Sequence, residues 1–328
     1  MNYFLCKLCF HGPVHFGSPN SAMSLETSED HFRADTLFSA LCHTALKAEG
    51  EKGIEQLCRW VQQGELLLSD SMPWESLDGE DRYYLPKPLA VSKKPAELPT
   101  HQRKAFRQLN WIPVEALSLF EDSIQSGKPY QPEQYPSTFG ISVQRTQANT
   151  RLGEDTVPYQ VGLFQFASDC GLYFLCACQT EEQEEELYQW ITFLGGSGIG
   201  GKTSAGYGAF QIDDWILLND PFDEQTKSFY ERLTQRAEAY LLLSSSLPTA
   251  NELDCALDGA AYQLVRRSGF VFSETYAQQP RKKQVQYFLT AGSVVRHSFQ
   301  GELYSVGSKD AIHPVYRYGK PLLLGVNL

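Results

Sequence analysis

The chain has 328 residues, of which 42% are hydrophobic and 20% charged, with a formal net charge of −11 at pH 7. This length can bury a sizeable core and predicts two domains, whereas the negative charge counts against a general, sequence-blind nucleic-acid binder, which is normally basic. No apolar run is long enough to span a bilayer and the N-terminus has no signal-peptide pattern, so we expect a cytoplasmic protein without a membrane partner.

The first half alternates segments with the character of strands and helices. Residues 2–10 have the pattern of a strand, and residues 35–49 predict an amphipathic helix that ends at Gly50. Thr180 and Gln183 form a capping box that begins a second helix. Further strands are expected at residues 65–68, 83–85, 161–165, 172–177 and 207–212. The order β-α-β-β-α-β is typical of the ferredoxin-like arrangement.

A long insertion, from about residue 86 to residue 158, interrupts this first unit. It is rich in Pro, Lys, Arg and Gln and only weakly periodic. A structureless loop of this length is unusual in a compact domain unless it is functional. We therefore expect an arm or hairpin that projects from the sheet.

A second, strand-rich unit is expected after Trp215, which divides the chain into residues 1–215 and 216–328. A short helix is predicted at residues 249–258. Strands are predicted at residues 239–243, 262–265, 269–272, 285–289, 294–295 and 321–326. The predicted fold class is α+β.

Cys6 and Cys9 form a C-x-x-C pair in the first predicted strand. A zinc site normally needs a second pair a dozen or more residues away, and none is present. Strand positions three apart also face opposite sides of the sheet. We expect Cys6, Cys9, Cys176 and Cys178 to be small buried hydrophobic residues, and we predict no metal and no cofactor.

Residues 195–208 contain seven glycines in fourteen positions, and residues 196–203 match the P-loop spacing of nucleotide-binding proteins. A P-loop requires a strand before it and a helix after it, but here a predicted helix precedes the glycines and a strand follows them. Nucleotide hydrolysis is therefore disfavoured.

The same glycines could let the backbone approach the phosphates of an RNA, with Lys202 adding a charge and the hydroxyls of Thr203 and Ser204 donating hydrogen bonds. Tyr207 could stack on a base or pack in the sheet, and both alternatives stay open. A tight helix-to-strand turn is the alternative for the glycines. The candidate RNA-contacting residues of this loop are Gly198, Ile199, Gly200, Gly201, Lys202, Thr203, Ser204 and Tyr207.

Other candidates lie outside the glycine loop. Arg145 and Arg151 flank a polar run that begins at Thr146 and suits contacts with phosphate and ribose. Lys87, at the root of the insertion, could hold phosphate or be ordinary solvated surface. His15 and Phe16 follow the first strand, and His15 could line the RNA or only form hydrogen bonds within a turn.

Charge is distributed unevenly along the chain. Residues 87–107 contain six Lys or Arg and a single acid, Glu97, and residues 281–283 form a second basic cluster. Acidic residues gather at positions 181–186. This asymmetry suits a protein that holds a polyanion along one face and contacts protein partners with another.

Several segments occur together in an order that resembles the RAMP proteins of CRISPR–Cas systems. They are residues 15–17 (His-Phe-Gly), 34–41, 84–88, the glycine loop at 195–210, 262–271, 291–294 and the His313–Gly319 motif. The resemblance extends over about residues 1–326. It is greatest to the subunit that caps the 5′ end of the guide RNA in type III-A (Csm) effector complexes.

The resemblance implies two ferredoxin-like (RRM-like) domains, with a thumb-like arm inserted in the first. It also implies a non-catalytic, RNA-binding role in antiviral defence. Such a subunit holds the repeat-derived 5′ tag of the crRNA, docks on the large polymerase/cyclase-like subunit, and begins the filament of backbone RAMP subunits. His313 and Arg317 of the last motif could cap the interface between the domains or touch the tag, and we prefer the structural role for both.

A second function stays open, because related RAMP proteins cut guide precursors without a metal. In a metal-independent endoribonuclease, His15 would act as general acid or base and Lys202 would stabilise charge on the phosphate. The sequence offers no second clear acid or base. We therefore expect no catalytic residue and prefer the structural, RNA-binding role.

Overall fold

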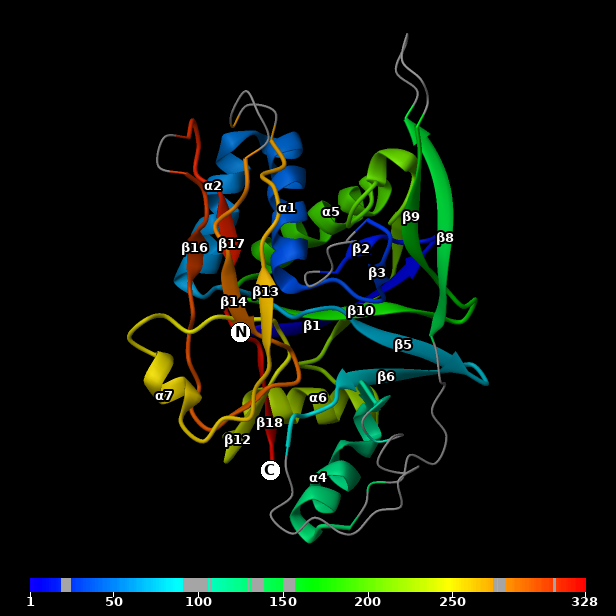
Figure 1. The fold of residues 1–328 in the computed structure, drawn as a ribbon. Coiled ribbons are helices and arrows are strands. Elements are labelled where there is room, and N and C mark those ends of the chain that lie inside the picture. Colours follow the sequence, from blue (N-terminus) through cyan, green and yellow to red (C-terminus); the bar gives the residue numbers. More distant parts are fainter. Residues whose placement is uncertain are drawn as a thin grey trace.

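The computed structural model describes residues 1–18, 25–90, 106, 108–128, 130, 139–149, 157–273, 276, 281–308 and 311–328. Their largest structure is an antiparallel sheet in which β1 lies between the edge strand β11 and β10 (Figure 1). In spatial order its strands are β11 (Phe210–Leu217), β1 (Asn2–Phe10), β10 (Cys170–Cys178), β5 (Met72–Leu77), β6 (Glu80–Pro86) and β7 (Trp111–Pro113). A short strand, β4 (Leu66–Leu68), also pairs with β10.

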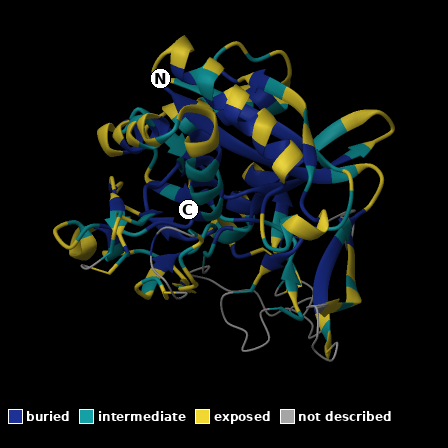
Figure 2. Ribbon diagram, turned by 90° about the horizontal axis from the view of Figure 1, so that it is seen from above, coloured by how far each residue is buried: buried dark blue, intermediate teal, exposed yellow. Residues whose placement is uncertain are grey.

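Both faces of this sheet are covered, which explains why β1 is apolar on its two sides. Phe4, Cys6 and Leu8 belong to one apolar cluster, whereas Leu5 belongs to another. The first cluster is closed by three helices, α1 (Ala34–Glu49), α2 (Glu51–Gln63) and α5 (Glu181–Ser197). Figure 2 shows that the buried residues concentrate in the strands and on the inner sides of these helices.

The second half of the chain covers the opposite face of the sheet. Leu241 and Leu324 pack in one cluster with Leu5 and Tyr173 of the central sheet. The other cluster contains Leu303 and Tyr318 from the second half, so both apolar clusters draw on residues from the two ends of the chain. The elements of this half are α6 (Glu224–Thr234), β12 (Ala239–Leu242), α7 (Leu253–Leu257), β13 (Leu264–Arg267), β14 (Gln286–Leu289), β15 (Val294–Val295), β16 (Leu303–Ser305), β17 (Tyr316–Tyr318) and β18 (Leu323–Val326).

The described part of the insertion forms two different structures. A short 3-10 turn, η1 (Val114–Ala116), and helix α4 (Leu117–Ser126) follow β7. A ten-rung antiparallel hairpin of β8 (Gly140–Asn149) and β9 (Val157–Phe166) then projects from the body of the molecule (Figure 1). A small ribbon, β2 (Phe16–Gly17) with β3 (Ser28–Glu29), lies against the hairpin, since Gly162 donates its N–H to the Leu25 carbonyl.

Several predicted elements are confirmed. Helix α1 ends at Gly50, which has a φ of 72° and donates its N–H to the Leu46 carbonyl. Helix α5 begins with the predicted capping box of Thr180 and Gln183. The helix predicted at 249–258 is present but shorter. The strand predicted at 262–265 is present as β13, but it is shifted towards the C-terminus and includes Arg266 and Arg267.

Other predictions were wrong or incomplete. Helices α2 and α6 and strands β5, β16 and β17 were not predicted. Residues 269–272 are not a strand, because they make only an isolated bridge between Phe270 and Lys282. The strand predicted at 207–212 begins at Phe210, since Gly208 has a φ of 77° and still belongs to the loop.

A buried ion cluster joins the two halves of the chain. Arg267 on β13 binds the Asp35 carboxylate of α1 with two nitrogens, at 2.6 and 2.9 Å. Arg317, which is 4% exposed, donates to the carbonyls of Arg267 and Gln284 and lies 3.7 Å from Asp35. The structural role predicted for Arg317 is confirmed. Asp35, in the first turn of α1, provides the negative charge opposite these arginines.

The cysteines pack as predicted for a strand. Cys6, Cys176 and Cys178 are buried in the cluster under the helices, whereas half-buried Cys9 packs against the opposite cluster. Cys6 and Cys9 therefore cannot share a ligand. Within the described residues, no three His, Cys, Asp or Glu side chains are grouped to hold a metal ion. None of the helices among those residues is long and apolar enough to cross a membrane.

Candidate nucleic-acid interface

The glycine loop runs from the end of α5 to the start of β11. Gly198 ends the helix with a φ of 81°, and its N–H donates to the Leu194 carbonyl at 2.7 Å. Lys202 adopts the left-handed conformation, with a φ of 61°, and only a three-residue turn, η2 (Thr203–Ala205), follows it. This order of helix, loop and strand is the predicted one. No long helix follows the lysine, so the loop lacks the phosphate-binding helix of a P-loop.

Most of the glycines in this loop are explained by close packing inside the protein. A Cβ at Gly200 would lie 2.6 Å from the His15 carbonyl oxygen, and a Cβ at Gly201 would lie 2.6 Å from the His15 ring. A Cβ at Gly208 would overlap the Ile199 carbonyl. The number of glycines is therefore accounted for largely by the tight turn, the alternative to phosphate approach. Phosphate binding has to rest on other groups.

Three successive backbone amides are available for such binding. The N–H groups of Lys202, Thr203 and Ser204 have no hydrogen-bond partner among the described residues. They open the η2 turn, and the loop is half-buried to exposed here. Consecutive free amides that follow a left-handed residue form a concave site for an anion. The neighbouring amides of Ile199, Gly201 and Gly208 are already used by carbonyls of the protein.

Lys202 connects the glycine loop to the β8–β9 hairpin. Its Nζ lies 4.7 Å from the centre of the Tyr159 ring and 3.3 Å from the Tyr159 hydroxyl. That hydroxyl donates to Gln147, and the Gln147 amide donates to the Tyr207 hydroxyl at 3.1 Å. The loop and the hairpin therefore form one continuous surface that carries the Lys202 ammonium.

Four of the predicted contact residues are buried inside the protein. Tyr207 is 7% exposed and packs with Val161 and Leu163, so the packing alternative describes its ring. Ile199 and Phe16 are buried in the main core. His15 is buried as well, and its Nδ1 lies 2.7 Å from the Gly162 carbonyl of β9, so its hydrogen bond crosses to the hairpin instead of staying within a turn.

The hairpin residues divide between its two faces. Arg145 is exposed and shares a face with Gln147, whose side chain reaches Tyr207, so Arg145 lies on the side of the glycine loop. Thr146 points to the other face, where its hydroxyl accepts from the Gln160 amide at 2.9 Å. Arg151 lies outside the described residues. The structure thus brings Arg145 and Lys202 to the same side of the molecule.

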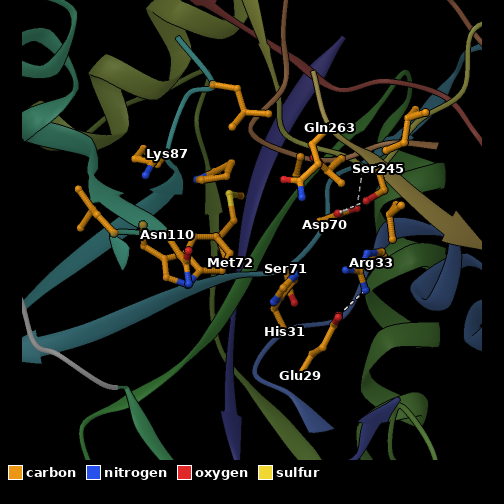
Figure 3. Close-up of a pocket in the computed structure, with 18 residues that line it drawn as sticks. Glu29, His31, Arg33, Asp70, Ser71, Met72, Lys87, Asn110, Ser245 and Gln263 are labelled. Atoms are coloured by element: carbon orange, nitrogen blue, oxygen red, sulfur yellow. Dashed lines mark hydrogen bonds and ion pairs between the residues drawn. The ribbon is translucent and has the colours of Figure 1, made fainter. Parts of the chain in front are cut away.

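Lys87 lies in a different place, a pocket of about 430 Å³ where the first half of the chain meets the second (Figure 3). Its Nζ donates to the Phe106 carbonyl at 2.8 Å, and burial lowers its pKa. Arg33 and His31 also line the pocket. The side-chain amides of Asn110 and Gln263 have no partner within the described residues, and the Trp111 ring forms part of the wall.

The pocket and the glycine loop are connected by the β2–β3 ribbon. Phe16 lies under Gly200 and pairs with Glu29, and Glu29 lines the pocket and binds Arg33. Asp70 forms the back of the pocket. Its buried carboxyl accepts the N–H groups of Ala34 and Ser245, and burial raises its pKa.

Most of the pocket residues were not predicted from the sequence. Arg33, Asn110 and Gln263 are far apart in the chain and share no motif. Residues 84–88 and 291–294 were noted as matching segments, and Lys87 and Ala291 from them do line the pocket. Lys87 and Ala291 come together only because the two halves of the chain pack against each other, and no local sequence pattern reveals that packing.

Two family models match this chain, one in each half. The model of the RAMP superfamily matches residues 7–211, and that of the CRISPR Csm4 C-terminal domain matches residues 235–326. The chain therefore belongs to the RAMP superfamily, whose mixed α/β fold with antiparallel sheets it has.

Curated relatives identify the family more closely. The chain is 35% identical over 315 residues to "CRISPR system Cms protein Csm4" of Mycobacterium tuberculosis H37Rv, which covers 95% of this chain and 94% of the relative. It is 27% identical over 330 residues to the protein of the same name from Streptococcus thermophilus, covering 98% of both chains. Within the RAMP proteins, the chain belongs to the Csm4 family of type III CRISPR systems.

Solved structures share the fold over the whole chain. A chain of the Csm3–Csm4 subcomplex in the type III-A CRISPR–Cas interference complex matches with a TM-score of 0.65 and 19% identity, covering 100% of both chains. A chain of the Csm1–Csm4 cassette in complex with pppApA matches with a TM-score of 0.60 and 20% identity, covering 100% of this chain and 99% of the other.

Proposed function

We propose that this chain is a non-catalytic RNA-binding subunit of a type III-A CRISPR effector (Csm) complex, in which it holds the repeat-derived 5′ tag of the crRNA. The observation that carries the proposal is the run of three unpartnered amides at Lys202, Thr203 and Ser204. Lys202 and Arg145 add positive charge to the same side. Amides and cations at these positions can hold the phosphates of a single strand without reading its sequence.

The pocket at Lys87 contains groups that could bind a base, which contacts with the phosphates alone do not provide. Its volume of about 430 Å³ is sufficient for one nucleotide. Trp111 offers an aromatic surface, Asn110 and Gln263 offer free amides for base edges, and Arg33 offers a cation. Single-stranded RNA is commonly recognised through bases that are splayed out, stacked and hydrogen-bonded in this way. We propose that one unstacked nucleotide of the tag enters this pocket.

The proposed partners follow from the family. Relatives with the same fold form a Csm3–Csm4 subcomplex and a Csm1–Csm4 cassette. We propose that this chain likewise joins the large polymerase/cyclase-like subunit to the backbone RAMP subunit, in the cytoplasm, in antiviral defence.

We also propose that residues 1–215 and 216–328 are two ferredoxin-like (RRM-like) domains. The order β11-β1-β10 with β4 and β5, covered by α1 and α5, supports this for the first domain. The β8–β9 hairpin would be its thumb-like arm.

The test is to assemble the complex on tagged crRNA with the triple variant Lys202→Ala, Arg145→Ala, Arg151→Ala. We expect affinity for the RNA to fall by about tenfold or more, because each lost cation removes a phosphate contact. The matched control changes three exposed lysines elsewhere, Lys52, Lys128 and Lys227, to Ala. If the triple variant binds tagged RNA as tightly as the control does, the assigned surface is wrong.

The endoribonuclease alternative gains no support from the position of His15. Its imidazole is 6% exposed, and Nδ1 is engaged by the Gly162 carbonyl. Incubating the protein with repeat RNA in EDTA should leave the RNA intact. Specific cleavage that disappears in the His15→Gln variant would replace the proposed role with this enzymatic one.

A further inference from the structure

A second groove lies away from the glycine loop and from the pocket at Lys87. It is bounded by α1, α2 and the segments around residues 271–273, 283 and 312–316, and it has a volume of about 450 Å³. No residue of the glycine loop or of the β8–β9 hairpin lines it. The groove therefore needs an explanation that is separate from RNA binding.

Large apolar side chains surround this groove and are open to solvent. Phe272 is 79% exposed, Ile312 is 80% exposed and Leu46 is 44% exposed. All three line the same hollow. Contiguous exposed apolar side chains around a concave surface usually mark a site that another molecule covers.

The groove contains a lysine whose side chain has no direct partner. Lys283 is half-buried and its backbone N–H donates to the Gly269 carbonyl, but its ammonium makes no ion pair or hydrogen bond with the described residues. Burial lowers the pKa of this ammonium, and the more distant Asp35 carboxylate only partly offsets that. His43 lies against the Phe272 ring, and burial together with Lys283 lowers the pKa of this histidine. His313 also lines the groove, where its Nε2 lies 2.9 Å from the Ser273 hydroxyl. A carboxylate placed here would relieve the unpaired charge of Lys283.

Other residues that line the groove carry the opposite charge. Glu51 and Glu55 of α2 are exposed, line the groove, and form no ion pair with the part of the chain that is described. These carboxylates would repel the phosphates of a nucleic acid, and Leu46 and Ile312 offer it nothing to bind. A peptide segment with apolar side chains and a carboxylate matches both the walls and the floor.

We infer that this groove docks a protein segment of the large subunit of the effector, one that presents apolar side chains beside an aspartate or glutamate. The inference rests on the proposed function for the choice between the two partner subunits. In the proposed function the guide RNA runs from the tag along the backbone subunits, which places the backbone partner next to the glycine loop and hairpin. The groove, built from other elements, is left for the large subunit.

The test measures the affinity of the full-length chain for the purified large subunit. The double variant Phe272→Ser, Ile312→Ser should weaken it by about tenfold or more, because aromatic and aliphatic anchors carry most interface energy. Lys283→Met, which keeps the length of the side chain but removes its charge, should weaken it as well. The matched control is Leu119→Ser, Phe222→Ser, which removes two large apolar side chains of 64% and 70% exposure elsewhere.

Binding of tagged crRNA and of the backbone subunit is measured on the same samples. Both should be unchanged in the groove variants, since the residues of the glycine loop are untouched. Unchanged affinity for the large subunit would overturn the inference, as would a loss of backbone binding or of RNA binding in its place. A failure of the proposed function appears separately, as wild-type assembly by the Lys202, Arg145 and Arg151 triple variant.

Discussion

Two glycines of the same loop illustrate how differently one residue type can be used. Gly208 has a φ of 77°, and a Cβ there would overlap the Ile199 carbonyl. Gly196, near the end of α5, has open space within 4 Å of the position where a Cβ would stand. Only Gly208 is required by the fold.

Substituting each of them with Ala should therefore change stability in opposite directions. Gly208→Ala should lower the free energy of unfolding by about 2 kcal/mol or more, since a strained backbone and a steric overlap add. Gly196→Ala should be neutral or raise it by up to about 1 kcal/mol, because Ala is the better helix former. Urea unfolding of the two variants measures this. Equal destabilisation by both would contradict the packing described for Gly208.

A second effect at the residue scale depends on pH. The carboxyl of Glu186 on α5 accepts a hydrogen bond from Gln56 at 2.6 Å, and Glu49 lies close enough to share a proton with it. Partial burial, then the charge and hydrogen bond of Glu49, then the charge of Glu182, raise the pKa of Glu186 to about 7. The folded protein thus holds a proton that the unfolded chain releases near pH 4.3.

The stability contributed by this proton is complete at low pH and is lost as the pH rises through about 7. The melting temperature should therefore fall as the pH rises from about 4.3 to about 7 and level off above that, and the Glu186→Gln variant should lose this part of the dependence. Glu185→Gln, at an exposed neighbour on the same helix, is the control and should keep it. A Glu186→Gln profile that matched the wild type would show that the pair does not share a proton.

At the scale of elements, two helices were predicted from their local signals, and two others were missed although each carries a signal. Helix α5 was found from its Thr180–Gln183 capping box, and α1 from its apolar stripe and Gly50. Helix α6 has a capping box too, but it is formed by Asp223 and Thr226, a less recognisable pair. Helix α2 carries an apolar stripe that the sequence does show, at Ile54, Leu57, Cys58 and Val61.

The candidate site was predictable only where it is local. The glycine loop and its lysine could be found, because helix, loop and strand follow one another in the chain. The burial of Tyr207 could not, because it depends on Val161 and Leu163 of a hairpin forty residues earlier. The Lys87 pocket is lined by residues from both halves of the chain, so no local sequence pattern could predict it.

The ion cluster between α1 and β13 has its own consequence for stability. Burial alone would raise the pKa of the Asp35 carboxyl. The charges of Arg267, Arg317 and Arg33 outweigh this effect and hold the pKa below its usual range. Asp35→Asn should lower the free energy of unfolding by about 3–5 kcal/mol, because it leaves a buried arginine without its counterion. Urea unfolding tests this, with Asp254→Asn on exposed α7 as the control. A loss below about 1 kcal/mol would mean that solvent screens the cluster.

At the scale of the whole molecule, the net charge of −11 limits binding to bare RNA. Long-range repulsion opposes the attraction of the few cations at the glycine loop and hairpin. We expect the isolated chain to bind tagged RNA poorly at physiological salt and more tightly inside the assembled complex. For three phosphate contacts, the logarithm of the affinity should fall with the logarithm of salt concentration with a slope of about −2. Fluorescence anisotropy at several salt concentrations measures the slope, and tight, salt-insensitive binding by the free chain would contradict the expectation.

The apolar clusters on either side of the central sheet draw on both ends of the chain, and this affects how the protein is made. A ribosome releases β1 and β10 long before β12 and β18. Until then, Leu5 and Tyr173 on one side of the sheet lack the leucines that later cover them. The nascent chain must be shielded from aggregation during this interval, and its final strands complete the fold.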